Sequence, residues 1–279
     1  MSFTTYKTLT ALGAMTALGL SAAFIGCSSD DNVTTPPLVD SGTDANTGPV
    51  QKGQVIEFSL SNTVTGVSGA TVDLGGKTAT TSDTAPKGSY SLAVTKDSPF
   101  YMRVTKAGYT TLLEQEWQVS GDADRARTVL PSATFTGALV TAIGKENVDG
   151  SKGVLGIGLV KGTCPTEAGA TIQVNPTGTD ASSTPVVYFS GGLPSQQQQT
   201  QAGELTPTAL AFNVTLGAPT VVVTPPAGCK VLSFPYTDPS TPNITYTGNI
   251  KVEPVGSFAD DAGAVTHLTS FARIFLAAQ

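Results

Sequence analysis

Short blocks in which apolar and polar residues alternate recur along most of the chain after residue 50. A period of two is typical of β-strands that bury one face against a core. Pairs of turn-forming residues, such as Gly75-Gly76 and Ala107-Gly108, separate these blocks. In the first half of the chain the pattern predicts strands over residues 54–60, 70–74, 89–94, 101–105 and 114–119. Short strands without a long amphipathic helix predict an all-β fold of antiparallel sandwiches.

One part of this pattern occurs twice. Residues 69–74 read GATVDL, and residues 169–174 read GATIQV. The flanking blocks return in the same order: Lys52-Gly53 matches Lys152-Gly153, residues 89–94 resemble 209–214, and residues 104–109 resemble 223–229 with one proline inserted. Several matches in one order indicate two copies of a domain. The final stretch, residues 243–279, has no evident counterpart in the first copy.

The first 26 residues have the composition of an export signal. Lys7 supplies a positive charge, and residues 9–25 form an uncharged apolar run. The run ends at Gly26-Cys27 and resembles the lipobox of bacterial lipoproteins, although Phe24 stands where that family usually has leucine. The resemblance implies that Cys27 is lipidated and becomes the mature N-terminus, and Ser28 after it implies an outer-membrane address. An ordinary signal peptide or an uncleaved anchor is the alternative interpretation.

Residues 27–50 are predicted to be a disordered tether. They contain acidic residues, threonine, proline and glycine but almost no large apolar side chains, so they cannot bury enough surface to offset the entropy of ordering. Asp40 and Asp44 lack the spacing of a calcium-binding loop. The segment is therefore interpreted as a solvated linker.

Four motifs in the first copy occur in one order: GATVDLGG at 69–76, a threonine-rich turn at 80–83, GSYSL at 88–92, and KAGY at 106–109. This order resembles the carboxypeptidase regulatory-like (transthyretin-like) β-sandwich family, with extra residues 84–87 in the turn. The resemblance implies one such domain over residues 51–133. The repeat then predicts a second, diverged β-sandwich over residues 134–279, so that two tandem transthyretin-like or Ig-like domains follow the tether. Members of the family are mostly non-catalytic accessory modules, which implies that this chain is not an enzyme.

Two cysteines remain if Cys27 carries lipid. Cys164 and Cys229 would then lie in an exported chain, where disulfides form and persist. The repeat aligns Cys164 with Val64 and Cys229 with Tyr109, so each pair is expected to be neighbours within its own domain. A Cys164–Cys229 disulfide is therefore predicted, and two unpaired core thiols are the alternative.

The composition argues against several functions. Charged residues make up 13% of the chain, the net charge is −6, and no cluster of lysine and arginine is present, which excludes a typical nucleic-acid surface. The single histidine, His267, has no serine or cysteine motif beside it and is expected on the surface or an edge strand. With one histidine and no clustered cysteines, neither a metal nor another cofactor is predicted. The glycines of residues 153–158 lack the order of a dinucleotide loop and indicate a strand.

Carboxylate pairs and aromatic residues are the remaining candidates. The pairs Glu114/Glu116 and Asp122/Asp124 could serve a glycosidase only if two acids from separate strands shared a cleft, so they are expected to be solvated edge and loop charges. Trp117 is expected in the core. Rings of a sugar-binding loop would come from Tyr188, Phe234, Tyr236 and Tyr246. Packing of these rings onto the domain is the alternative. Residues 269–276 are expected to form a closing strand, with a short helix as the alternative.

Together these observations predict a non-enzymatic, lipid-anchored protein of the cell envelope with a binding, structural or accessory role. A carbohydrate-binding surface lipoprotein is the second hypothesis, and a hydrolase that uses carboxylates alone is the third. The expected partners are the membrane, through the anchor, and an envelope protein or a glycan; nucleic acid is not expected. The expected location is the outer membrane, facing the periplasm or the outside.

Overall fold

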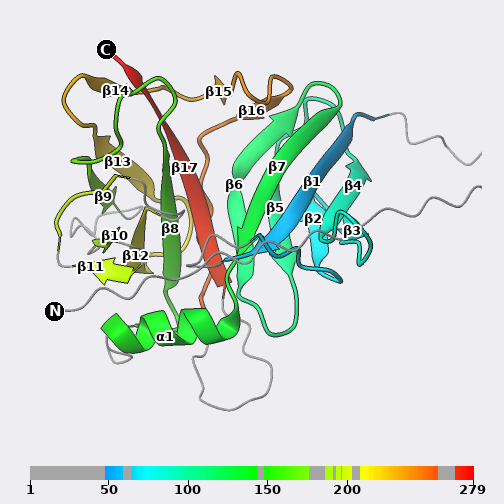
Figure 1. Cartoon of the computed structure of the whole chain (residues 1–279), viewed down its shortest axis with the longest axis horizontal. Coiled ribbons are helices and arrows are strands. Elements are labelled where there is room, and N and C mark those ends of the chain that lie inside the picture. The colour runs from blue at the N-terminus through cyan, green and yellow to red at the C-terminus, as the bar shows by residue number, and fades with distance from the viewer. Residues whose placement is uncertain are drawn as a thin grey trace, which may run out of the picture. The chain divides into compact units, whose positions relative to one another are not determined.

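The residues that the structure describes form an all-β fold with one short helix (Figure 1). The computed structural model describes residues 48–58, 64–143, 148–175, 186–190, 193–195, 197–202, 208–256 and 268–279, which belong to one compact unit, Asp44–Gln279. The predicted signal peptide and nearly all of the predicted tether lie outside these ranges. The helix is α1 (Ala133–Ile143). The strands before it are β1 (Val50–Glu57), β2 (Thr71–Leu74), β3 (Lys77–Thr80), β4 (Ser89–Ala93), β5 (Phe100–Thr105), β6 (Thr111–Val119) and β7 (Ala123–Leu130). The strands after it are β8 (Gly153–Val160), β9 (Thr171–Asn175), β10 (Val186–Ser190), β11 (Leu193–Ser195), β12 (Ala209–Val214), β13 (Thr220–Thr224), β14 (Cys229–Val231), β15 (Tyr236–Thr237), β16 (Ile244–Tyr246) and β17 (Leu268–Ala278).

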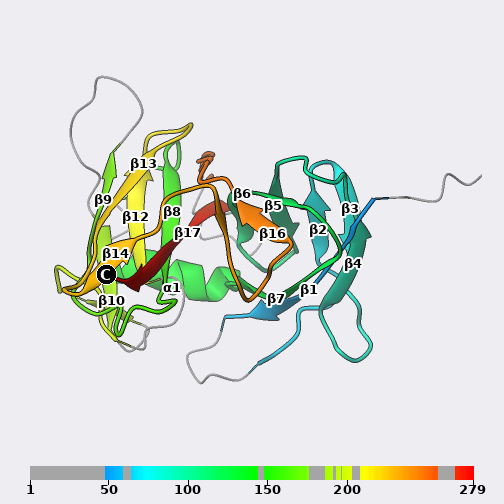
Figure 2. The same ribbon diagram turned by 90° about the horizontal axis from the view of Figure 1, so that it is seen from above.

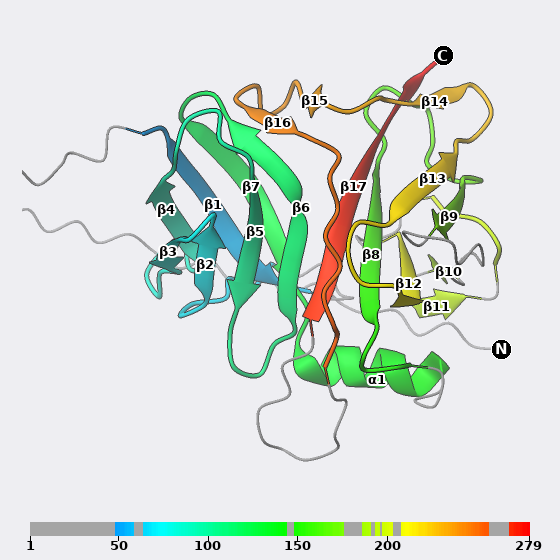
Figure 3. The same ribbon diagram turned by 180° about the vertical axis from the view of Figure 1, so that it is seen from behind.

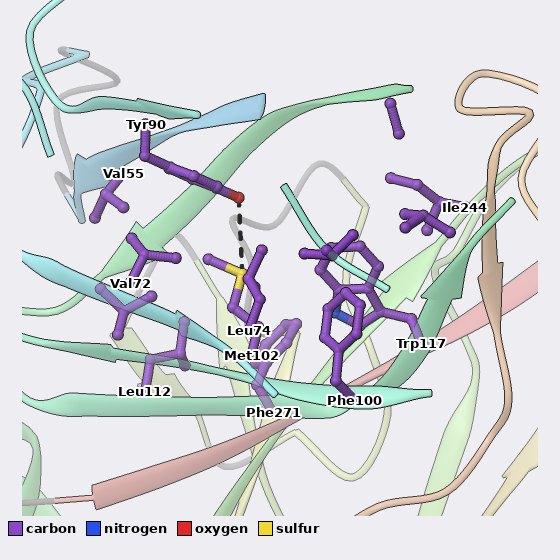
Figure 4. Packing of buried hydrophobic residues seen from close by; sticks show 14 of the residues in the cluster. Val55, Val72, Leu74, Tyr90, Phe100, Met102, Leu112, Trp117, Ile244 and Phe271 are labelled. Carbon is purple, nitrogen blue, oxygen red and sulfur yellow. Dashed lines mark hydrogen bonds between the residues drawn. The ribbon is translucent and has the colours of Figure 1, made fainter. Parts of the chain in front are cut away.

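Strands β1–β7, called the first module below, form a sandwich of two sheets. In one sheet β1 pairs with β4 in the antiparallel and with β7 in the parallel direction. In the other, the order is β3-β2-β5-β6. The sheets enclose a core to which β1 contributes Val55, β2 Val72, β5 Met102 and β6 Trp117 (Figure 4). These side chains alternate with exposed or half-buried neighbours along β2 and β5, which is the pattern that predicted the strands.

Strands β8–β14 and β17, called the second module below, repeat this arrangement. Strand β8 pairs with β12 in the antiparallel and with β17 in the parallel direction, as β1 does with β4 and β7. Strands β9 and β13 form the facing pair, as β2 and β5 do. The core between them contains Leu155 and Ile157 of β8 and Ile172 and Val174 of β9. The expectation that residues 243–279 have no counterpart was wrong for β17 at their end, which takes the place that β7 has in the first module.

The buried side chain of Thr81 holds the first Gly-Ala-Thr string where strand β2 begins. The amide of Gly69 donates to the carbonyl of Thr81 at 2.9 Å, and the amide of Ala70 donates to the Thr81 hydroxyl at 2.8 Å. That hydroxyl in turn donates to the carbonyl of Val67 at 2.6 Å. Gly69 has a φ of +67°, which a residue with a Cβ rarely adopts. The threonine thus holds both sides of the turn that leads into β2.

The second string has the same contacts. The amide of Gly169 donates to the Thr200 carbonyl at 2.9 Å, and the amide of Ala170 donates to the Thr200 hydroxyl at 3.0 Å. This hydroxyl donates to the carbonyl of Glu167, and Gly169 has a φ of +87°. Both Thr81 and Thr200 are buried. The sequence repeat is therefore also a repeat of local hydrogen bonding.

Strand β17 joins the two modules. It runs parallel to β6 on one side and to β8 on the other, so that a single twelve-stranded sheet crosses the molecule (Figure 3). Its residues alternate between the cores: Phe271 and Phe275 belong to the core of the first module, and Ala272 and Ile274 to that of the second. The predicted boundary between residues 133 and 134 falls at the start of α1. The division into two domains remains a prediction, and strands from both sides of the boundary share this sheet.

Up to the end of α1, three elements were not predicted from the sequence: β3, β7 and α1 itself. Strand β3 is polar and half exposed, and β7 contains two arginines and an aspartate. Helix α1 contains three threonines, which favour strands, but Ser132 caps it by accepting a hydrogen bond from the Phe135 amide at 3.2 Å. The helix lies on the opposite side of β8 from β13 (Figure 2). Among the described residues, no helix has the length and apolarity needed to span a bilayer.

Candidate functional site

A cavity of about 70 Å³ lies between α1 and the twelve-stranded sheet. Its walls are largely apolar and come from α1, β6, β8, β12 and β17, with Phe135, Leu139, Leu210, Phe212 and Phe271 among them. Phe135, Leu139 and Phe212 are half-buried, so apolar surface reaches the mouth of the cavity. Helix α1, which links β7 to β8 along the chain, therefore also covers an apolar cavity.

Local packing fixes the helix over the cavity. The ring of Phe135 lies 4.4 Å from that of Phe58, measured between centroids, and the hydroxyls of Thr136 and Thr110 are hydrogen-bonded at 2.6 Å. On the sheet side, Gly156 leaves room for Phe271, because a Cβ at this position would lie 2.9 Å from the phenylalanine ring. A glycine in the interior of a strand often marks such a close approach.

A charge cluster contributes Glu114 and Arg273 to the wall of the cavity. Glu114 of β6 forms an ion pair with Arg125 of β7, and their side chains are only 3% and 4% exposed. Arg273 of β17 lines the cavity with Glu114, and its Nη2 lies 3.9 Å from the Glu114 carboxylate. Two guanidinium groups therefore surround one carboxylate. The Arg125 guanidinium also lies over the ring of Trp117, 5.2 Å from its centroid.

The two arginines differ in their electrostatic environment. Burial by itself disfavours a charged Arg125, but the adjacent Glu114 carboxylate outweighs it and raises the pKa of the guanidinium. The pKa of Arg273 is lowered, first by burial and second by the like charge of Arg125. The Nε of Arg273 and the Nη2 of Arg125 have no hydrogen-bond acceptor among the described residues. The cluster thus carries one more positive than negative charge and has donors to spare.

The carboxylates do not form a hydrolytic pair at this cavity. Of the acidic residues described, Glu114 alone lines it. The Glu116 carboxylate accepts hydrogen bonds from the hydroxyl of Thr247 at 2.8 Å and from the side-chain Nδ2 of Asn249 at 2.7 Å. Asp122 and Asp124 are exposed, as expected. The expectation of a solvated charge was wrong for Glu114, because arginines from β7 and β17 surround it and no local pattern around Glu114 indicates that they would.

The predicted disulfide between Cys164 and Cys229 is present, with the Cα atoms 5.4 Å apart. Both cysteines are 1% exposed and pack against Leu276 of β17. In the first module the aligned Val64 is 47% exposed and Tyr109 is half-buried, and that these two residues are neighbours stays a prediction. The disulfide is thus a feature of the second module alone.

The four candidate sugar-stacking rings do not form an exposed cluster. Tyr188 is 3% exposed, and its hydroxyl accepts a hydrogen bond from the Ile172 amide at 2.7 Å. Tyr246 is 4% exposed. Phe234, Tyr236 and Tyr246 all pack on Phe275 of β17, with centroid distances of 6.3, 4.5 and 5.0 Å. All four rings therefore pack onto the fold, which was the alternative interpretation. They do not form the cluster of exposed aromatic rings that would favour carbohydrate binding.

Two further candidates lie outside the described residues: the lipidation site Cys27 and the histidine His267. Across the ranges that the structure describes, no three histidine, cysteine, aspartate or glutamate side chains gather as a metal site would require. Sequence reasoning missed the cavity and its charge cluster. One signal for the charge cluster was available: Arg125 and Arg273 lie within otherwise strand-like segments. A charged side chain is rarely buried in a strand unless it is paired, so each arginine pointed to a partner.

No protein-family model matches the chain, and no curated protein matches it. Among solved structures, it is similar to GBS52, the minor pilin of the Gram-positive pathogen Streptococcus agalactiae, at 12% identity with a TM-score of 0.26, covering 83% of this chain and 97% of that one. It is also similar to the shaft pilin SpaA from Lactobacillus rhamnosus GG, at 13% identity with a TM-score of 0.22, covering 84% and 98%. Similarity at this level carries no argument about function.

Proposed function

We propose that this protein is a non-enzymatic, lipid-anchored accessory protein of the cell envelope, which holds a rigid pair of β-sandwich modules at a distance from the membrane. One observation carries the proposal: β17 is a central strand shared by both modules. Separating the modules would break the ladder to β6 and expose Phe271 and Phe275, which lie in the first core. The two modules would therefore move as one body, as suits a spacer or a partner subunit.

The sequence supplies the other half of the proposal. Residues 27–50, as a flexible coil, would span about 25 Å between the membrane and the modules. The lipobox-like end of the apolar run at Cys27 supports anchoring by lipid, and Ser28 supports an outer-membrane address. The absence of an enzymatic role is supported by the cavity, where the one acidic residue described is already ion-paired with Arg125.

The experiment is an intact-mass measurement of the protein from membrane fractions, with and without reduction. A chain that begins at Cys27 and carries two or three acyl groups is expected, with a gain of two hydrogens when the Cys164–Cys229 disulfide is reduced. Cys27→Ser is expected to release the protein from the membrane, whereas the matched control Ser28→Ala keeps it there. An unacylated chain recovered in the soluble fraction would refute the anchor and favour a freely secreted binding protein.

A further inference from the structure

The cavity under α1 has the properties of a binding site that the accessory role does not explain. Its enclosed space of about 70 Å³ is roughly half of an engineered 150 Å³ cavity that binds benzene. By that ratio it could enclose about three carbon atoms, which is the length of the carbon chain of butyrate beyond its carboxylate. Because its walls are apolar, water inside would find few partners, whereas an aliphatic chain would find van der Waals contacts with Phe135 and Leu139.

The charged side chains in the wall select the polar group of the ligand. Glu114 is neutralised by Arg125, which leaves the charge of Arg273 in excess. The Arg273 side chain is 24% exposed, and its Nε has no acceptor among the described residues. A desolvated guanidinium donor without an acceptor is costly, and a carboxylate matches its planar array of N–H groups. An ammonium group would be repelled, and an alcohol would leave the excess charge unbalanced.

We infer that the cavity binds a short aliphatic monocarboxylate, with its carboxylate on Arg273 and its carbon chain between α1 and the sheet. Charge complementarity determines the head group, and the enclosed volume determines the chain length. The pKa of Arg273 is lowered first by burial and second by the like charge of Arg125, and a bound anion would offset both effects. The inference does not depend on the lipid anchor or on the spacer role.

The test is titration of the full chain, purified from whichever cell fraction contains it, with sodium butyrate, 1-butanol and butylamine, followed by calorimetry and by ligand-observed NMR. Butyrate is water-soluble and stays in the aqueous phase, so it does not partition into lipid during the titration. Butyrate is expected to bind at least tenfold more tightly than butanol, the ratio that one charge-assisted hydrogen bond supplies, and butylamine is not expected to bind. Contacts between the butyrate methyl group and the rings of Phe135 or Phe212 are expected in the NMR spectra.

Variants separate the site from non-specific binding. Arg273→Met leaves the Glu114–Arg125 pair intact and is expected to abolish the preference for butyrate over butanol. Its matched control is Arg103→Met. Arg103 forms an ion pair with Glu253 at 2.6 Å and does not line the cavity, so its removal should not change binding. Leu139→Phe, which fills the cavity, should weaken butyrate binding, whereas Ala138→Phe on the exposed side of α1 should not. Equal binding of butyrate and butanol, no detectable butyrate binding, or equal effects of each variant and its control would overturn the inference.

Discussion

Removing the disulfide of the second module tests whether the shared strand makes the two modules one cooperative unit. The perturbation is Cys164→Ala combined with Cys229→Ala. The bridge closes a loop with a sequence separation of 65 residues. From the loop-closure entropy of the unfolded chain, its loss is expected to lower the free energy of unfolding by about 4 kcal/mol. For a unit of this size, that corresponds to a fall in Tm of about 8–16 °C.

The assay uses two probes. Trp117 is the only tryptophan, is fully buried, and lies in the first module, whereas far-UV circular dichroism reports on strands of both modules. The two transitions are expected to coincide in the unmodified protein, as two-state unfolding requires. In the double variant they are expected to move together, although the disulfide is in the other module, because β17 contributes Phe271 and Phe275 to the core around Trp117.

The reasoning has a definite point of failure. If the circular dichroism transition moved while the Trp117 fluorescence transition shifted by less than about 1 kcal/mol, the modules would unfold independently, and β17 would not couple them. The control is Val64→Ala, at the position aligned with Cys164. Because Val64 is 47% exposed, its truncation should change the free energy of unfolding by less than about 0.5 kcal/mol.

Three further predictions concern buried polar groups, each measured by urea unfolding. Thr81→Val and Thr200→Val should each cost about 1–3 kcal/mol, because a buried amide and a carbonyl lose their partner; Thr→Ser at either position should retain most of the stability, and a neutral Thr→Val would contradict the repeated motif. Glu114→Gln should cost about 3–5 kcal/mol by leaving two guanidinium groups unbalanced, whereas Arg273→Met should cost less than about 1 kcal/mol; equal costs would contradict the assignment of Arg125 as the main partner. Burial raises the pKa of Tyr90 to about 12, whereas in the unfolded chain the tyrosine ionises near pH 10. The free energy of unfolding that Tyr90 contributes is therefore complete below pH 10, and about 3 kcal/mol of it is lost as the pH rises from 10 to 12. Tyr90→Phe should remove this part of the alkaline loss, and an unchanged pH profile would argue against it.

Local features of the fold were predictable where the chain itself carries the signal. The Gly-Ala-Thr strings predicted β2 and β9 because alternation, a turn glycine and a repeated order agree there. The disulfide was predicted from the same alignment. The strings did not reveal that Thr81 is the hydrogen-bond partner of the first string and Thr200 that of the second. The segments between each string and its threonine differ in length, so the sequence alignment does not match the two threonines.

Features that depend on distant segments were not predictable. Arg273 lies on β17, close to the end of the chain, whereas Glu114 and Arg125 lie on β6 and β7 in its first half, and nothing in either neighbourhood indicates that both arginines reach Glu114. The helix α1 was missed because its threonine-rich sequence has weak local preference, and it forms where Phe135 packs on Phe58 and Ser132 provides the cap. The cavity exists only once these elements meet, so no sequence pattern could have predicted it.

The ambiguity at the end of the chain has a physical explanation in the position of β17. A strand that buries one face alternates cleanly, but a strand in the middle of a sheet covered on both faces is apolar on both, and its alternation is lost. Residues 268–278 read LTSFARIFLAA, and both Phe271 and Ala272 are buried, each in a different core. The imperfect alternation that left a helix open as the alternative is therefore what a strand between two cores should show. The same argument identifies Arg273 as the charged exception within such a strand, and its side chain lines the cavity together with Thr269 and Phe271.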